Sequence, residues 1–143
     1  MLNYDSVASR IKQSDKIPSL MSMLHWNISN DEATSTITQL LDVLCDDDYD
    51  MLMLAGHKHT WRNTVKLIAA AGYPKNKKAL PSLVLQLQDL NWPGANEGMH
   101  VLKMAHEADK DVLIPILEAA IESAFVDSDF IWLAGIKQFL ALA

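Results

Sequence analysis

The stretch Leu80-Pro81-Ser82-Leu83 decides the fold class, because the same pattern recurs at Ile17-Pro18-Ser19-Leu20 and Ile114-Pro115-Ile116-Leu117. Proline is favoured at the first position of a helix, where its missing N–H would have no partner, so each copy predicts a helix start. A fourth start is expected at Tyr49-Asp50-Met51-Leu52, where Asp50 takes the place of the proline. An acidic residue also suits a first helical turn. The predicted starts at 18, 50, 81 and 115 lie 31 to 34 residues apart.

Each repeat unit is long enough for two helices joined by a turn. One of residues 29–31 is expected to cap the second helix, and Asp127 is the candidate cap between the last two helices. Gly72 followed by Pro74 is a helix stop signal. The predicted helices cover residues 16–26 and 30–44, 48–56 and 58–71, 79–90 and 94–107, and 110–124 and 128–142.

The choice of apolar residues favours helices over strands. Leu, Ala and Met account for 43 residues, whereas Val and Ile account for 17, and β-branched side chains lose rotamer freedom in a helix. Helix pairs at this spacing are typical of α-solenoids, whose repeats run from ~34 to ~40 residues. We therefore predict an all-α fold, a HEAT-like α-α superhelix of about four helical pairs, in a single domain over residues 1–143. The alternative is an irregular helical bundle in which the matches arose by chance.

The bulk composition excludes several classes of protein. Half of the 143 residues are hydrophobic, and 12 Lys and Arg against 18 Asp and Glu give a net charge of −6. These values do not fit a disordered tail, a collagen-like repeat or a generally basic nucleic-acid binder. Cys45 is the only cysteine, so no intramolecular disulfide can form. The first 16 residues lack the apolar core of a signal peptide, and no stretch approaches the ~20 apolar residues of a membrane span. We expect a soluble, cytoplasmic protein.

The charged residues are distributed in three blocks along the chain. Residues 51–88 hold six bases and no acid, whereas the blocks before and after them each carry a net charge of −6. Within the basic block, Lys58, Arg62 and Lys66 follow an i, i+4, i+8 spacing that places them on one helix face. These three are candidate binding residues for a carboxylate-rich partner or a phosphate. The alternative is that this basic stripe pairs inside the domain with the acidic segment 42–50.

Other candidate sites lack residues that their chemistry requires. The segment 46–50 begins like a calcium loop, but Met51 and His57 stand at the positions that need Gly and Glu. Glu97 and His100 form a single Glu-x-x-His, whereas a di-iron site needs a second such pair and two further glutamates. No nucleophile elbow, P-loop or dinucleotide fingerprint occurs. We therefore predict no catalytic residue, no metal and no cofactor, and a protein that is not an enzyme.

One segment resembles a known family. Residues 80–95, LPSLVLQLQDLNWPGA, contain a Leu-Gln-Asp-x-Asn-Trp-Pro motif that is similar to the signature of a small bacterial family of unknown function. The resemblance covers residues 79–143 and includes an aromatic residue near Trp132. It implies a bacterial source and a HEAT-like helical fold, and it transfers no catalytic residue. Trp92 is a further candidate binding residue. Its alternative role is to fill the gap between two helices, with Pro93 starting the next helix.

These observations favour a non-enzymatic protein–protein interaction module that binds another protein through one face of the helical stack. A concrete version is a small, acidic bacterial immunity protein that blocks a toxin. The alternative is a small enzyme, or a binder of a phosphate or other anionic ligand, at the basic segment 51–88. A nucleic-acid-binding repeat ranks last, because the acidic flanks oppose a phosphate backbone. No membrane partner is expected.

Overall fold

The computed structural model describes residues 3–5, 8 and 15–143. Within these residues the chain forms eight α-helices and three short 3₁₀ segments, and it contains no strand. The eight helices make four consecutive pairs, and the two helices of each pair contact one another. The pairs are α2 (Lys16–Ser22) with α3 (Asn30–Val43), α4 (Leu52–Ala55) with α5 (Lys58–Ala71), α6 (Leu80–Leu85) with α7 (Ala95–Ala108), and α8 (Ile114–Val126) with α9 (Phe130–Leu142).

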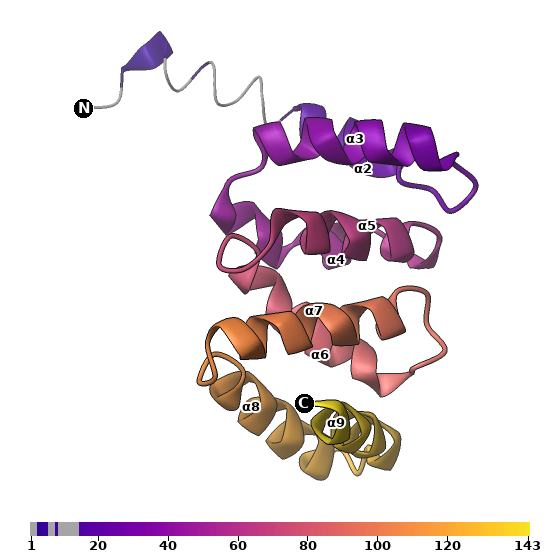
Figure 1. Ribbon diagram of the computed structural model, residues 1–143, viewed down its shortest axis with the longest axis vertical. Helices are drawn as coiled ribbons and strands as arrows, with labels where there is room; N and C mark the ends of the chain where they lie inside the picture. The colour runs from indigo at the N-terminus through magenta and orange to yellow at the C-terminus, as the bar shows by residue number, and fades with distance from the viewer. Residues whose placement is uncertain (1–2, 6–7, 9–14) are drawn as a thin grey trace.

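The pairs stack on one another in chain order (Figure 1). Helices α3, α5 and α7 lie side by side in one layer, and α2, α4 and α6 form a second layer behind them. Helix α8 packs against α6, and α9 packs against α8 and the 3₁₀ segment η3 (Gln86–Gln88), so the last pair continues the stack with its helices turned. The predicted all-α class is confirmed. The assignment to the HEAT-like superhelices stays a prediction.

One hydrophobic core runs through the stack. On α6, the two leucines of the Leu-Pro-Ser-Leu motif, Leu80 and Leu83, are buried, whereas Pro81 in the first turn is exposed. Burial of such apolar faces, rather than the propensity of these short helices, holds the fold together. The largest fully buried side chains come from every pair and its turns: Tyr49, Phe139, Leu24, Leu40, Leu52, Leu67, Ile68, Leu80, Leu83, Leu87, Leu102 and Leu113.

The start of the second pair differs from the prediction. Asp50 does not begin a helix, because Asp46–Asp50 form the 3₁₀ segment η1 and α4 begins at Leu52. The Asp48 carboxylate accepts a hydrogen bond from the Cys45 N–H at 2.7 Å. Bonding of a side chain to the nearby backbone is the reason that aspartate favours turns over helix interiors. The first helices of the pairs consequently begin at 16, 52, 80 and 114, which is a less regular spacing than predicted.

Of two predicted helix caps, one is confirmed and one is confirmed in part. The Ser29 hydroxyl accepts a hydrogen bond from the Glu32 N–H at 3.2 Å and caps α3, as predicted. Asp127 is the C-cap of α8, but it does not cap the start of α9. The cap is Asp129, whose carboxylate accepts from the Trp132 N–H at 3.0 Å.

Two glycines permit close approaches between pairs. Gly135 on α9 lies against η3, where a β-carbon would overlap the Leu87 carbonyl oxygen. Gly94 has a φ of 88° and lies against α5, with its β-carbon position 3.0 Å from Val65 Cγ2. Gly94 is also the N-cap of α7, so this helix begins after Gly94. The prediction that Pro93 starts the helix is therefore wrong.

Two expectations concern membranes and targeting. In the part of the chain that the structure describes, no helix has the length and apolar character needed to span a bilayer. The expected lack of a signal peptide concerns mostly residues 1–14, of which only 3–5 and 8 are described, so this prediction lies largely outside the described residues.

Candidate protein-interaction groove

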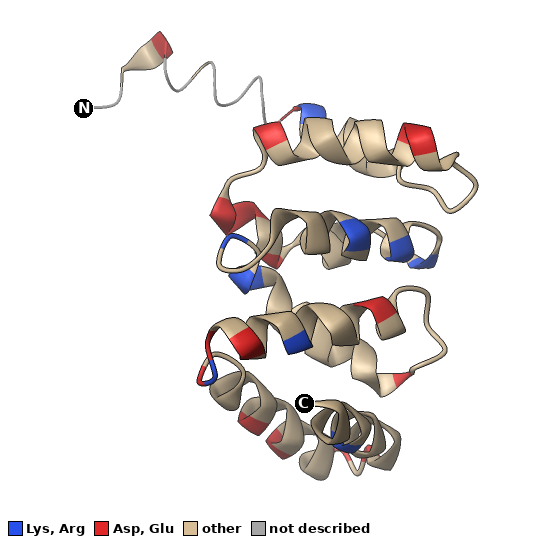
Figure 2. Cartoon of the chain, in the orientation of Figure 1, with Lys and Arg blue, Asp and Glu red and all other residues tan. Residues whose placement is uncertain are grey.

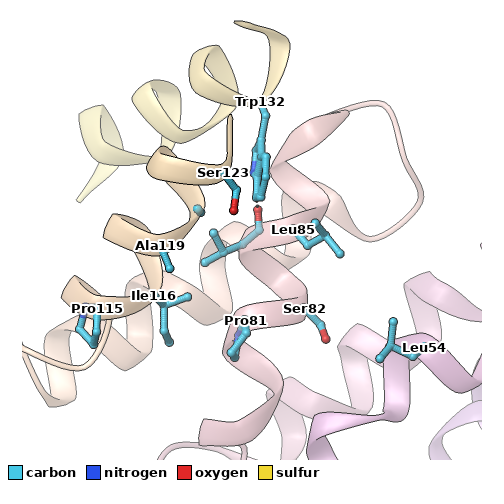
Figure 3. A pocket seen from close by; sticks show the side chains of 11 residues that line it. Leu54, Pro81, Ser82, Leu85, Pro115, Ile116, Ala119, Ser123 and Trp132 are labelled. Atoms are coloured by element: carbon cyan, nitrogen blue, oxygen red, sulfur yellow. Dashed lines mark hydrogen bonds between the residues drawn. The ribbon is translucent and has the colours of Figure 1, made fainter. Parts of the chain in front are cut away.

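An open apolar groove lies between α6 and α8. Its volume is about 540 Å³, within the ~300–1,000 Å³ range that is usual for ligand pockets. Figure 3 shows side chains of α6 and α8 along its walls and Trp132 of α9 at one end. Among the described residues, no charged side chain contributes to the lining. That lining consists of Leu54, Pro81, Ser82, Val84, Leu85, Pro115, Ile116, Ala119, Ala120, Ser123 and Trp132.

The repeated proline motif builds part of both walls. On α6, the leucines of the motif face the core, which leaves Pro81 and Ser82 to line the groove. On α8, Pro115, Ala119 and Ser123 are spaced by four residues and therefore lie along one side of the helix. The pattern that predicts the helix starts thus also places small, uncharged side chains on the groove.

Trp132 closes one end of the groove and joins two pairs. Its ring is 7% exposed, and its indole Nε1–H donates to the Val84 carbonyl of α6 at 3.0 Å. The dashed line in Figure 3 marks this hydrogen bond. Because the N–H is bonded to the backbone, the ring has a fixed orientation and presents an apolar surface to the groove.

A second hollow, mostly apolar but also lined by Asp48 and His57, continues the surface toward the start of the chain. It has a volume of about 390 Å³, lies between α2 and α4, and includes Ile17 and Pro18 from the first copy of the motif. Met51 lines this hollow and Leu54 lines the α6–α8 groove, and they are 56% and 73% exposed. Apolar side chains therefore follow one another across α2, α4, α6 and α8.

Carboxylates border one end of the α6–α8 groove. A smaller hollow of about 330 Å³ shares Ala119 and Ser123 with the groove and is also lined by Glu122 and Asp127. Both carboxylates are exposed, and neither forms an ion pair with another described residue. Lys16 is the only Lys or Arg on α2, α4, α6 and α8. The groove is consequently uncharged along its walls and negative at this end.

The basic stripe lies in the other layer of the stack, where Figure 2 shows blue segments along α5. Lys58, Arg62 and Lys66 are all exposed. Arg62 Nε donates to Glu97 Oε1 on α7 at 3.1 Å. In the described part of the chain, none of the three forms an ion pair with the acidic segment 42–50. The alternative, in which the stripe pairs with the acidic segment, therefore does not hold for the described residues.

The acidic segment η1 is instead paired with the loop that follows α5. Lys78 Nζ donates to Asp47 Oδ1 at 2.5 Å, and η1 packs against the 3₁₀ segment η2 (Lys77–Ala79). The hydrogen bond to Asp47 raises the pKa of the Lys78 ammonium. Lys75 Nζ also reaches back, to the Leu41 carbonyl at 3.3 Å. Lys78 of this loop, and not the stripe, thus forms the ion pair with the acidic segment.

A cleft of about 450 Å³ between α5 and α7 adjoins the basic stripe. Lys66, His100 and Asn76 are among the residues that line it. Asn76 is 2% exposed, and its Nδ2 donates to the Ile68 carbonyl at 2.8 Å. Its Oδ1 has no hydrogen-bond partner among the described residues. A buried acceptor of this kind favours a ligand that brings a hydrogen-bond donor.

Three histidines come together in a way that their spacing did not predict. His25, in the turn between α2 and α3, stacks on His59 with ring centroids 5.4 Å apart, and His57 lies 5.3 Å from His59. Trp26 packs edge-on against His59 at 4.3 Å. His25 reaches the cluster from another pair, so spacing within one helix could not reveal it. Across the described ranges, no group of three or more His, Cys, Asp or Glu side chains is arranged to hold a metal ion.

Comparison with known proteins finds no relative: no family model, no curated protein and no solved structure matches this chain. The resemblance of residues 79–143 to a bacterial family therefore stays a prediction. The surfaces described above are accordingly the observations that bear on function.

Trp92, in the motif that carries this resemblance, is partly buried and packs on Trp61 of α5. The two ring centroids are 5.5 Å apart at an interplanar angle of 59°. In the same turn, the Asp89 carboxylate accepts from the Asn91 N–H at 2.9 Å. These contacts give the motif a packing role between η3 and α7, and a binding role for Trp92 stays a proposal.

Proposed function

We propose that this chain is a non-enzymatic protein-binding module that holds a partner in the α6–α8 groove. The open, uncharged groove supports the proposal, because it leaves Leu54 and Leu85 73% and 41% exposed. Covering such surface with apolar side chains of a partner releases ~25 cal/mol per Å². Helical repeats of HEAT type use continuous surfaces of this kind to bind other macromolecules.

A specific version of this proposal is a bacterial immunity protein that blocks a toxin. The small size and the net charge of −6 suit an inhibitor that covers a basic toxin surface. The resemblance of residues 79–143 to a bacterial family agrees with such a source. Co-expression with a toxin encoded beside it is then expected to protect the cell.

Photocrosslinking in cells of the natural host tests the proposal. A photoreactive residue at Ala119, exposed in the groove, should capture a partner that the same residue at Ala134 does not. Ala134 is exposed on α9 outside the groove and serves as the matched control. The captured protein, once purified, should bind the Ala119→Gln variant at least ~10-fold more weakly, which corresponds to about 1.4 kcal/mol. Failure to find a groove-dependent partner, together with no toxin neutralised on co-expression, would contradict it.

A second candidate function is the binding of a phosphate or other anion beside the α5–α7 cleft. Lys58 and Lys66 are exposed two turns apart on the same helix face, Lys66 also lines the cleft, and neither forms an ion pair with another described residue. Tripolyphosphate is a suitable probe for calorimetry. Replacing Lys58, Arg62 and Lys66 by Ala should abolish binding and leave stability within ~0.5 kcal/mol per site. The matched control replaces Lys103, Lys110 and Lys137, which removes the same charge elsewhere. Loss of stability instead would show that the stripe is structural.

A further inference from the structure

We infer that the groove partner is an apolar helix with a Lys or Arg at the end that reaches Glu122 and Asp127. This inference rests on the proposed function and adds the conformation, the direction and the charge of the bound segment. Three observations carry it: the helical walls of the groove, the unpaired carboxylates at one end, and the poor fit of the exposed apolar turn of a second copy of this chain.

The walls of the groove favour a helix as the occupant. Both walls are helices whose backbone groups bond within α6 and α8, and the described residues contain no strand to which an extended segment could add. An extended segment would bury backbone N–H and C=O groups against apolar side chains without partners, which costs free energy. A helix satisfies its own backbone and presents a ridge of apolar residues at i, i+3, i+4 and i+7. From Pro115 to Ser123 the wall of α8 is about 12 Å long, which matches about two turns of a bound helix.

The charges at the two ends favour one direction. Glu122 and Asp127 stand at the C-terminal end of α8, where the partial negative charge of the helix adds to their own. At the opposite end, where α6 and α8 begin, the exposed Lys77 and Asp111 lie four residues before Pro81 and Pro115 and carry opposite charges. A cation on the bound helix is therefore stabilised near Asp127 and not near Pro81.

The exposed apolar turn of a second copy of this chain is a poor occupant. On this chain the cations of the stripe and the exposed large apolar side chains lie on different elements. The three cations are on α5, and none of the exposed large apolar side chains of the described residues is on that helix. The most apolar exposed segment, Phe125 to Ile131, contains Asp127 and Asp129. Docking this segment into the groove would bring its carboxylates toward Glu122, and the like charges would repel one another. The α8–α9 turn of a second copy is therefore disfavoured, and the charge of the groove favours a basic, apolar helix of a different protein.

Selection from a displayed library of random 16-residue peptides on the intact protein tests the inference. Peptides that need the groove should lose at least ~10-fold in affinity with Ala119→Gln, a change of about 1.4 kcal/mol, and none with Ala134→Gln. Their sequences should combine apolar residues at i, i+3, i+4 and i+7 with Lys or Arg at one end. The double variant Glu122→Gln/Asp127→Asn should bind them about 3- to 10-fold more weakly at low salt, and the difference should shrink as salt is added. The double variant Asp42→Asn/Glu107→Gln removes two exposed carboxylates elsewhere and should bind normally.

The outcomes separate the inference from the proposed function. Groove-dependent peptides that lack an excess of basic residues, or that bind Glu122→Gln/Asp127→Asn with unchanged affinity, overturn the inference alone. A selection that yields no peptide sensitive to Ala119→Gln overturns the proposed function and the inference with it. A wild-type dimer by sedimentation that becomes a monomer with Ala119→Gln would show that a second copy fills the groove.

Discussion

Tyr49 is the largest fully buried side chain of the described residues, and its hydroxyl has no hydrogen-bond partner among them. Burial, reinforced by Asp46 and Asp48, raises its pKa to about 12. The phenol is therefore held in its neutral form, because its ionised form would sit in an apolar site next to two carboxylates. An acidic segment thus lies directly against the core without placing a charge inside it.

Raising the pH from 10 to 12 should lower the free energy of unfolding through Tyr49. The unfolded chain releases this proton near pH 10, whereas the folded chain keeps it until about pH 12, so the stabilisation is complete below pH 10 and is lost above it. A shift of two units corresponds to about 2–3 kcal/mol. Denaturant unfolding across this range should show a smaller loss for Tyr49→Phe than for the wild type. Parallel losses in the two proteins would contradict the raised pKa.

Gly135→Ala should destabilise the protein, although alanine is normally favoured over glycine in a helix by ~1 kcal/mol. The added β-carbon would overlap the Leu87 carbonyl oxygen, a backbone atom that can move only with η3. We expect a loss of about 1–3 kcal/mol in denaturant unfolding. The neighbouring, exposed Ala134 provides the control, and Ala134→Ser should change stability by less than ~0.5 kcal/mol. A more stable Gly135→Ala protein would show that η3 can move away from α9 at little cost.

At the scale of the elements, all eight described helices overlap the ranges expected from apolar periodicity, Pro at helix starts and Gly at helix ends. Two of the errors in the helix bounds occur where a side chain competes for the backbone. Asp48 bonds to the Cys45 N–H and delays α4. Before α9, Ser128 adopts a φ of 53°, which makes Asp129 and not Asp127 the residue that faces the first free N–H groups. Such choices depend on local dihedral angles that composition does not encode.

Asp129→Ala should destabilise the protein more than Asp127→Ala, which removes the same charge two residues away. Asp129 accepts from the Trp132 N–H and also from the Gln88 side-chain amide at 3.4 Å, so its loss leaves both donors without this partner. The expected cost is about 1 kcal/mol for Asp129→Ala and less than ~0.5 kcal/mol for Asp127→Ala. Urea unfolding of both variants measures the difference. Equal costs would mean that the two aspartates contribute through charge alone.

At the scale of the whole molecule, the charge blocks predicted the exposed stripe on α5, but they did not predict the groove. The groove collects Leu54, Pro81, Ile116 and Trp132 from four helices that are distant in the sequence. The groove residues are of the same apolar types as those of the core, so the sequence does not distinguish the two sets. The stacking of the helices decides which apolar side chains stay exposed. The histidine cluster escaped prediction for the same reason. A sequence reveals a surface site most readily when its residues share one helix, as those of the stripe do.

The turn between α8 and α9 should make the protein self-associate at high concentration. Phe125, Val126, Phe130 and Ile131 are 65%, 79%, 69% and 72% exposed within seven residues, which is an unusual density for a free surface. The double variant Phe125→Gln/Phe130→Gln should bind less anilinonaphthalene sulfonate and remain monomeric at higher concentrations. Met104→Gln removes a single apolar side chain, 64% exposed on α7, and should change neither property. Equal dye binding by the wild type and the double variant would contradict the prediction.

Trp132 couples what happens in the groove to the docking of the last pair. The same indole lines the groove and bonds α9 to the Val84 carbonyl, and helical stacks open most easily at their ends. A molecule that binds only while α8 and α9 are docked shifts that local opening by mass action, by about 2.7 kcal/mol when present at 100 times its dissociation constant. Amide hydrogen exchange in α8 and α9 then slows in proportion to occupancy. The exchange rates at the C-terminal end of the stack thereby report whether the groove is occupied.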